Sequence, residues 1–416
     1  MFKERKEIEI MAPVGSYESL MAAINAGANS VYFGVEKLNM RGQSSFNFTL
    51  DDLAQIVSIC KENDVKSYLT VNCILYDEDL AVMREIVDRA KVEGITAIIA
   101  SDHAAIVYAN KIGVEVHIST QLNLSNIEDV EFYSHFADVV VLARELNLEQ
   151  VKYIYTEIEK RDICGPKGEL VQIEMFSHGA LCMAVSGKCY LSLHEADKSA
   201  NRGTCRQICR RSYEVRDRDT GEELVVENKY IMSPKDLCTI DFLDKMVDAG
   251  VRVLKIEGRA RSAEYVKRVV ECYNEALDTI ADGTYSQEKV EVWKEKMAVV
   301  FNRGYWDGYY LGRRLGEWSD NYGSAATHKK VYVGKVTNYF KNISVAEILI
   351  EAATLEVGEE VMFSGPTTGV VEQSVEEIRV DLKARNITKQ GERCSIITKE
   401  LVRRGDALYK YVKVEK

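Results

Sequence analysis

The stretch EIEIMAPVG (residues 7–15) is followed by SYESLMAAINAGA (16–28) and then by SVYFGV (30–35). The first and third segments are apolar and end in Gly, Pro or both, which is typical of buried strands. The middle segment opens with a Ser suited to capping a helix and carries apolar residues at helical spacing. The chain therefore begins with a strand–helix–strand unit, which is the repeating element of a parallel sheet.

The same alternation continues to about residue 280. The predicted strands span residues 7–15, 30–35, 66–72, 96–101, 115–121, 138–144, 170–176 and 251–257. The main predicted helices between them span residues 16–28, 50–63, 78–93, 126–136, 148–160, 240–249 and 262–280. Near-continuous apolar strands indicate a parallel sheet buried on both faces, and this number of units favours a closed (β/α)8 TIM-like barrel. Functional residues are then expected at the carboxyl ends of the strands.

Two segments interrupt or follow this pattern. A cysteine-rich insertion is predicted at residues 177–239, inside a barrel domain that spans residues 1–280. A polar, aromatic and partly helical connector follows at 281–327. From 328 to 416 short alternating strands are separated by Gly, which predicts a small all-β barrel domain like those that bind RNA in translation factors.

Composition limits the class of protein. Of the 416 residues 46% are hydrophobic and only 4 are Pro, which is typical of a globular chain. A net charge of −11 argues against a broadly basic nucleic-acid-binding surface. No run of 18 apolar residues and no export signal is visible, so we expect a cytoplasmic protein without a membrane span. Its ten cysteines are then reduced thiols or metal ligands.

Four of these cysteines fall within 28 residues: Cys182, Cys189, Cys205 and Cys209. The spacings C-x6-C and C-x3-C suit ligands that converge on one metal centre, which is zinc or an iron–sulfur cluster. The first spacing is longer than in most zinc knuckles, which favours iron–sulfur. Cys238 competes for the last ligand place, although it is predicted to begin a helix in which its thiol can pack.

The loop around these cysteines is glycine-led and basic. Gly187 and Gly203 precede cysteines at points where the backbone needs to turn sharply. Between residues 198 and 211 the chain has five basic residues and no acid. This basic loop either holds phosphate or another anionic substrate, or neutralises thiolates on a cluster.

Polar residues at strand ends provide the other candidates. Lys255, Glu257 and Arg259 alternate at the end of the eighth strand, so they share one side and offer two cations and a carboxylate to an anionic substrate. The alternative is a buried ion pair of Glu257 with one of the two cations. Substrate contacts are also expected from residues in or near other strand ends, namely Asn72, Gln121, Arg144 and His178. The imidazole of His178 is either a donor to sulfur or substrate, or a structural group.

Three motifs in family order closely resemble the signature of peptidase family U32: EMFSHGALCMAVSGKCYLS (174–192), NRGTCRQICR (201–210) and KIEGR (255–259). The resemblance implies a 4Fe–4S cluster, because relatives with this cysteine signature carry an iron–sulfur cluster. They hydroxylate RNA bases or ubiquinone precursors without molecular oxygen. A barrel with a small β-domain looks like the tRNA hydroxylation protein P group. That similarity implies 5-hydroxyuridine formation at the wobble position of tRNA, with a small anionic co-substrate such as prephenate as hydroxyl source.

Two rival functions stay open. The family name implies a collagenase-like endopeptidase, but the sequence contains no G-x-S-x-G motif, and His103 and His117 lack the spacing of a zinc protease. The second rival is a non-catalytic RNA-binding protein in which the cluster is structural. A catalytic cluster needs access to substrate, whereas a structural one is buried.

Overall fold

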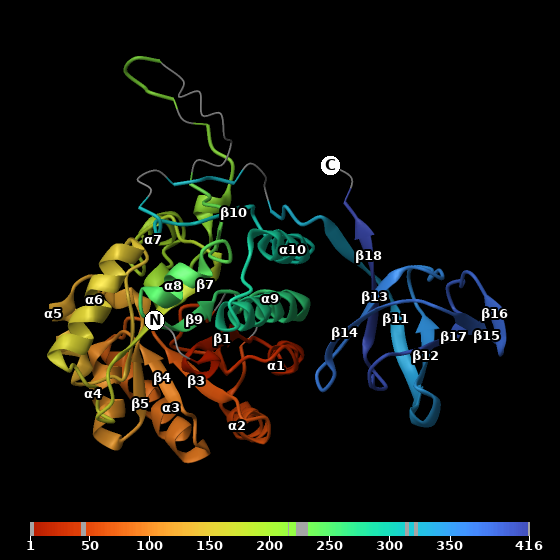
Figure 1. Ribbon diagram of the computed structural model, residues 1–416, viewed down its shortest axis with the longest axis horizontal. Coiled ribbons are helices and arrows are strands. Elements are labelled where there is room, and N and C mark those ends of the chain that lie inside the picture. Colours follow the sequence, from red (N-terminus) through yellow and green to blue (C-terminus); the bar gives the residue numbers. More distant parts are fainter. Residues whose placement is uncertain are drawn as a thin grey trace.

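The computed structural model describes residues 4–42, 47–214, 216–221, 232–312, 316–319 and 323–414. A parallel barrel forms its first part (Figure 1). The barrel is closed because the last strand pairs with both the first and the seventh, with Ile10 opposite Leu254 and Ile173 opposite Val251. The barrel strands are β1 (Glu9–Pro13), β2 (Ser30–Phe33), β3 (Lys66–Val71), β4 (Ala97–Ala100), β5 (Glu115–Ile118), β6 (Val139–Val141), β7 (Gln172–Ala180) and β9 (Val251–Ile256). The predicted TIM-like fold is confirmed.

A helix follows each barrel strand and covers the outside of the sheet. Apolar residues of these helices and the outward faces of the strands form one large buried core. At the start of the first helix, the Ser16 side chain accepts a hydrogen bond from the backbone N–H of Ser19, as the sequence predicts. The helices are α1 (Tyr17–Asn25), α2 (Leu53–Glu62), α3 (Leu80–Glu93), α4 (His103–Ile112), α5 (Ile127–Ser134), α6 (Leu148–Arg161), α8 (Leu243–Asp248) and α9 (Ala263–Ala281).

The insertion begins at the end of β7, which extends to Ala180. There β8 (Asp236–Cys238) pairs antiparallel with β7, and β10 (Tyr305–Trp306) pairs parallel with β8. The prediction that Cys238 begins a helix is wrong, because its backbone pairs with that of His178 in this short strand. Between these strands lies α7 (Leu191–Ala196), and α10 (Gln287–Ala298) packs on α9. Parts of the predicted insertion (215 and 222–231) and connector (313–315 and 320–322) lie outside the described residues.

The C-terminal part is all-β, as predicted. Its antiparallel sheet has the order β14-β13-β18-β11-β12-β17-β15-β16 and encloses its own apolar core. The two shortest strands, β15 and β16, were not among those expected from the sequence. The strands are β11 (His328–Phe340), β12 (Val345–Ile350), β13 (Glu360–Gly365), β14 (Gly369–Ser374), β15 (Ile378–Val380), β16 (Lys383–Arg385), β17 (Arg393–Ile397) and β18 (Ala407–Lys413).

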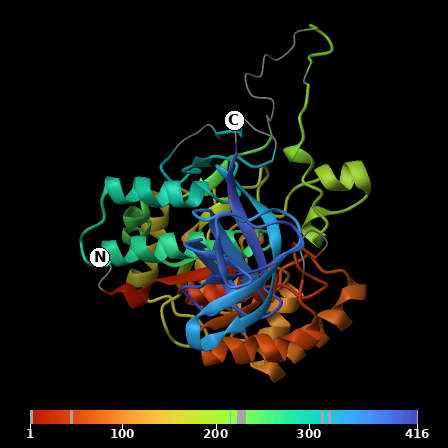
Figure 2. The same cartoon turned by 90° about the vertical axis from the view of Figure 1, so that its right-hand side faces the viewer.

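The β-domain lies beside the barrel, against α1 and α9 (Figures 1 and 2). A small apolar cluster joins Ala22 and Ala263 of the helices to Met362 and Val370 of the sheet. An ion pair of 2.7 Å between Arg268 and Glu372 adds to this contact. The β-domain is therefore docked on the side of the barrel. No helix in the described part of the chain is long and apolar enough to cross a membrane.

Candidate functional site

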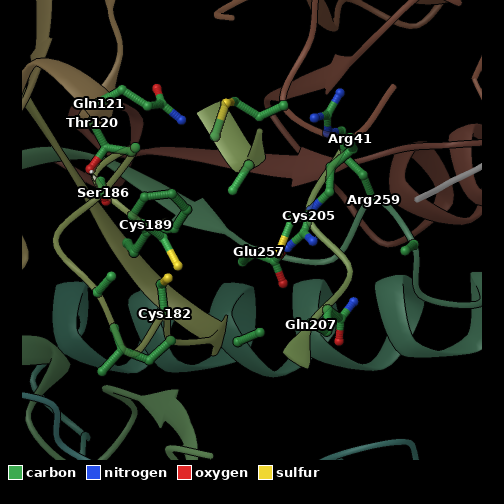
Figure 3. A pocket seen from close by; sticks show the side chains of 18 of the residues that line it. Arg41, Thr120, Gln121, Cys182, Ser186, Cys189, Cys205, Gln207, Glu257 and Arg259 are labelled. Atoms are coloured by element: carbon green, nitrogen blue, oxygen red, sulfur yellow. Dashed lines mark hydrogen bonds and ion pairs between the residues drawn. The ribbon is translucent and has the colours of Figure 1, made fainter. Parts of the chain in front are cut away.

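A cavity of about 330 Å³ opens at the carboxyl end of the barrel strands (Figure 3). Its lining combines residues that follow β2, β3, β5, β6, β7 and β9 with residues of the insertion. All four clustered cysteines and the three residues of the KIEGR motif line it, together with Asn72, Gln121 and Arg144. This cavity, called the mouth pocket below, therefore brings together ten of the twelve candidate site residues, and Cys238 and His178 do not line it.

The four thiols come from three short segments of the insertion. Cys182 directly follows β7, Cys189 precedes α7, Cys205 lies in a loop and Cys209 lies in a 3₁₀ turn. Figure 3 shows the sulfur atoms of Cys182 and Cys189 turned toward one another, with Cys205 across the pocket beside Glu257. Burial raises the pKa of the Cys209 thiol, Arg210 lowers it, and the other three thiols raise it further. All four cysteines line the same cavity.

Glycines allow the loops to approach each other. Gly203 has a φ of +82°, and a Cβ atom there would lie 2.2 Å from the backbone oxygen of Asn39. Gly187 has a φ of +76° and packs against Gln121. Both positions therefore need Gly, as the sequence indicates, and both set the position of a cysteine that follows.

Two observations bear on whether these four cysteines can hold a metal. Within the described residues, no three His, Cys, Asp or Glu side chains converge tightly enough to hold a metal ion as they stand. All four cysteines nevertheless line one cavity, and soft thiolate donors are those that an iron–sulfur cluster requires. A multi-atom cluster also spans a wider ring of ligands than a single ion. The chemistry of this donor set therefore suits a cluster better than a single ion.

Lys255 is tied to a carboxylate inside the barrel. Its Nζ lies 2.6 Å from Oε1 of Glu174, and the two side chains are 7% and 0% exposed. The other oxygen, Oε2 of Glu174, has no hydrogen-bond partner among the described residues and lies 3.9 Å from Nδ1 of His117. The expected alternative of a Lys255–Glu257 pair is wrong, because Lys255 pairs with this strand β7 carboxylate.

Glu257 is paired with a residue from another loop. Its Oε1 lies 2.9 Å from Nη2 of Arg41, in the loop after β2. Burial acts to raise the pKa of Glu257, but Arg41 and then Arg261 outweigh it, so the pKa lies below its usual value. The carboxyl group is therefore ionised and already engaged.

Arg259 is a buried cation whose hydrogen bonds reach neutral oxygens. Its Nη1 donates to Oδ1 of Asn39 and to Oγ1 of Thr70, each at 3.0 Å. Burial lowers the pKa of Arg259 to about 10, although Glu257 nearby acts to raise it. A bound anion would relieve this cost of burial. Arg259 is therefore the best-placed anion-binding group in the pocket.

The other predicted substrate contacts fall into two groups. Asn72, Gln121 and Arg144 line the pocket, and Nη2 of Arg144 donates to Oγ of Ser186 at 2.8 Å. His178 does not line it. Its ring is 1% exposed and packs among tyrosines, and burial lowers its pKa to about 3. His178 lies behind the pocket as a neutral imidazole, and its predicted role in substrate binding stays a prediction.

Sequence reasoning missed several charged residues in or beside the pocket, among them Glu174, Arg41, Arg261 and Arg303. Glu174 is an acid inside an otherwise apolar strand, which is a signal for a buried ion pair. Arg41 follows the second strand, so the rule that places functional groups at strand ends already pointed to its loop. Among the described residues, seven cations and one acid line the pocket: Arg41, Arg144, Arg210, Lys255, Glu257, Arg259, Arg261 and Arg303.

Comparison with known proteins identifies the family of this chain. A model of the family described as Peptidase family U32 matches residues 15–320. The chain is 62% identical to a protein of Porphyromonas gingivalis named collagenase, over 98% of this chain and 99% of that protein. It is 30% identical to tRNA hydroxylation protein P1 of Bacillus subtilis, over 90% and 87% of the two chains. It is 32% identical to a 23S rRNA 5-hydroxycytidine synthase of Escherichia coli, over 74% of this chain and 46% of that one.

Proposed function

This chain belongs to peptidase family U32, and we propose on that basis that it is an enzyme that hydroxylates a base in tRNA. The observation that carries the proposal is the mouth pocket itself, in which four thiols and an excess of cations face the same space. A redox centre and an anion site in one cavity suit the oxidation of an anionic substrate. The specific product we propose is 5-hydroxyuridine at the wobble position.

The pocket offers little to a peptidase. Its described lining contains no His and no Asp, and its single acid, Glu257, is held by Arg41. A hydrolase needs a nucleophile with a base beside it, or a metal-bound water oriented by a free carboxylate. Hydrolysis of collagen-like chains remains the second candidate, because the collagenase of Porphyromonas gingivalis is similar over nearly the whole chain.

We propose that Cys182, Cys189, Cys205 and Cys209 hold a 4Fe–4S cluster. When bound, such a cluster would supply one-electron redox chemistry at the mouth of the barrel. Cys238 is a poorer ligand candidate, because it is 2% exposed in β8 and does not line the pocket. Burial also raises the pKa of its thiol to about 12, which disfavours the thiolate.

The cations of the pocket would bind a small anionic co-substrate such as prephenate. Arg259 and Arg144 both line the cavity and hydrogen-bond neutral oxygens, so either guanidinium can receive a carboxylate. The reaction balances if the co-substrate exchanges its hydroxyl group for hydrogen. The base carbon then exchanges its C–H bond for C–OH and is oxidised by two electrons. The co-substrate carbon, whose C–OH bond becomes C–H, accepts those two electrons.

Reconstitution tests the proposal. Anaerobically purified protein with its cluster is incubated with undermodified tRNA and prephenate, and the nucleosides are analysed by mass spectrometry. We expect 5-hydroxyuridine with the protein as isolated and none with Cys182→Ser. Digestion of gelatin by the same preparation, without any change in the tRNA, would favour the peptidase.

A further inference from the structure

A second hollow of about 250 Å³ adjoins the mouth pocket and shares Gln207, Arg210 and Arg303 with it. We call it the arginine crevice. Among the described residues that line it, four are arginines and none is an acid. The lining residues are Arg206, Gln207, Arg210, Arg211, Ser233, Arg303 and Gly323.

One heptapeptide, CRQICRR (205–211), forms the wall between the two hollows. Cys205 and Cys209 line only the mouth pocket, whereas Arg206 and Arg211 line only the crevice. Gln207, which lies between them, is in the left-handed region with φ of 52°. This loop therefore contributes cysteines to the first hollow and arginines to the second.

Arg210 of the crevice has neutral hydrogen-bond partners. The guanidinium of Arg210 donates to Oγ of Ser233 (2.9 Å) and to the backbone oxygens of Pro234 (2.6 Å) and Leu181 (2.7 Å), all of them neutral. Because these hydrogen-bond partners are neutral, an anion in the crevice would supply a counter-charge to the Arg210 guanidinium.

The few carboxylates near the crevice are shared or peripheral. Asp236 accepts from Arg303 at 3.3 Å and from Arg261 at 3.4 Å, so one carboxylate serves two cations. Glu195 pairs with the exposed Arg211. Arg206 is exposed on the surface of the loop. The local charge is therefore positive on a chain whose net charge is −11, and RNA can approach such a chain only through a patch of this kind.

We infer that the arginine crevice binds a backbone phosphate of the RNA strand whose base enters the mouth pocket. Gln207, Arg210 and Arg303 line both hollows, so a strand bound in one is adjacent to the other. Arginine suits a phosphodiester because its fork donates two parallel hydrogen bonds. This inference rests on the proposed function and adds to it the site that positions the strand.

The experiment measures RNA affinity as a function of salt. A labelled anticodon stem–loop RNA is titrated with the cluster-containing protein, and fluorescence anisotropy gives Kd between about 50 and 200 mM salt. The variants are Arg206→Gln and the double variant Arg206→Gln with Arg211→Gln. The matched control is Arg89→Gln, which removes the same charge from an exposed i,i+4 pair with Glu93 on α3. Iron content and circular dichroism verify that the cluster and the fold are retained.

Each lost phosphate contact should reduce the slope of log K against log salt by about 0.7 for a single strand. We expect that reduction, and weaker binding irrespective of sequence, in the two crevice variants but not in Arg89→Gln. A slope equal to that of the control would overturn the inference while leaving the proposed function intact. Failure of the unaltered protein to bind RNA at all would overturn both.

A free phosphate ion offers the same chemistry as a backbone phosphate. Inorganic phosphate is therefore titrated alone, by calorimetry, against the unaltered protein and Arg206→Gln. Binding of inorganic phosphate that Arg206→Gln loses, without any effect of that change on RNA affinity, would contradict the RNA site.

Discussion

Replacing Glu174 by Gln should strongly destabilise the barrel. The substitution removes a carboxylate that is 0% exposed and 2.6 Å from Nζ of Lys255, whose side chain is only 7% exposed. The amide keeps the size of the side chain but leaves a buried ammonium without its counter-charge. Removing one partner of a buried pair typically costs about 3–5 kcal/mol. For a barrel of this size we expect a fall in Tm on the order of 10 °C.

The assay is urea unfolding followed by the fluorescence of Trp293, which is buried in the barrel core. Glu93→Gln is the control, because it weakens the i,i+4 pair of Glu93 with the exposed Arg89 on α3 and should cost less than about 1 kcal/mol. The double variant Glu174→Gln with Lys255→Met removes both buried charges and should recover most of the loss. A cost below about 1 kcal/mol for Glu174→Gln, or no recovery in the double variant, would refute the buried pair.

Three further predictions concern the pocket and the residues behind it. Cys182→Ser and Cys209→Ser should each lose most of the bound iron, whereas Cys238→Ser should retain it. Iron retained in Cys209→Ser and lost in Cys238→Ser would make Cys238 the ligand in place of Cys209. Arg259→Lys should keep the fold but lower activity and co-substrate affinity about tenfold or more, because an ammonium lacks the bidentate fork; kinetics equal to the unaltered protein would leave Arg259 structural. Burial, and then Arg261, lower the pKa of His178 to about 3. Only the unfolded chain then binds the proton below about pH 6.5, so stability should fall by about 1.4 kcal/mol per pH unit as the pH drops from there toward 3. His178→Gln should show a shallower acid limb in urea unfolding, and an unchanged slope would contradict a neutral, buried imidazole.

Much of the barrel was predictable because local signals coincide with its geometry. Strands such as IIA within residues 97–100 are apolar throughout, since both faces are covered, and each is followed by a helix with a cap or a closing Gly. The grouping of Cys182, Cys189, Cys205 and Cys209 also followed from spacing alone, because short loops keep their ends close.

Pairings between distant segments could not be predicted from the sequence. The partner of Lys255 lies 81 residues upstream, and their contact depends on how β7 and β9 align, with Phe176 opposite Lys255. The partner of Glu257, Arg41, comes from the loop after β2, two strands from β9 around the barrel and 216 residues away in the sequence. Cys238 was expected to begin a helix, and only the pairing of its backbone with His178 of β7 makes it part of a strand.

The docking of the β-domain on the barrel could not be predicted either, because no local sequence pattern marks the residues in contact. Ala22 and Ala263 are ordinary helix residues in the sequence, and Met362 is one apolar residue among many in its strand. Their contact is a property of the two surfaces together.

The central claim is that this chain modifies tRNA, and the most direct measurement is mass spectrometry of nucleosides from total tRNA of a deletion strain. We expect the strain to lose 5-hydroxyuridine and the nucleosides derived from it. The unaltered gene should restore them, and the Cys182→Ser variant should not. Unchanged nucleosides in a deletion strain that has no paralogue, together with digestion of gelatin by the pure protein, would contradict the claim.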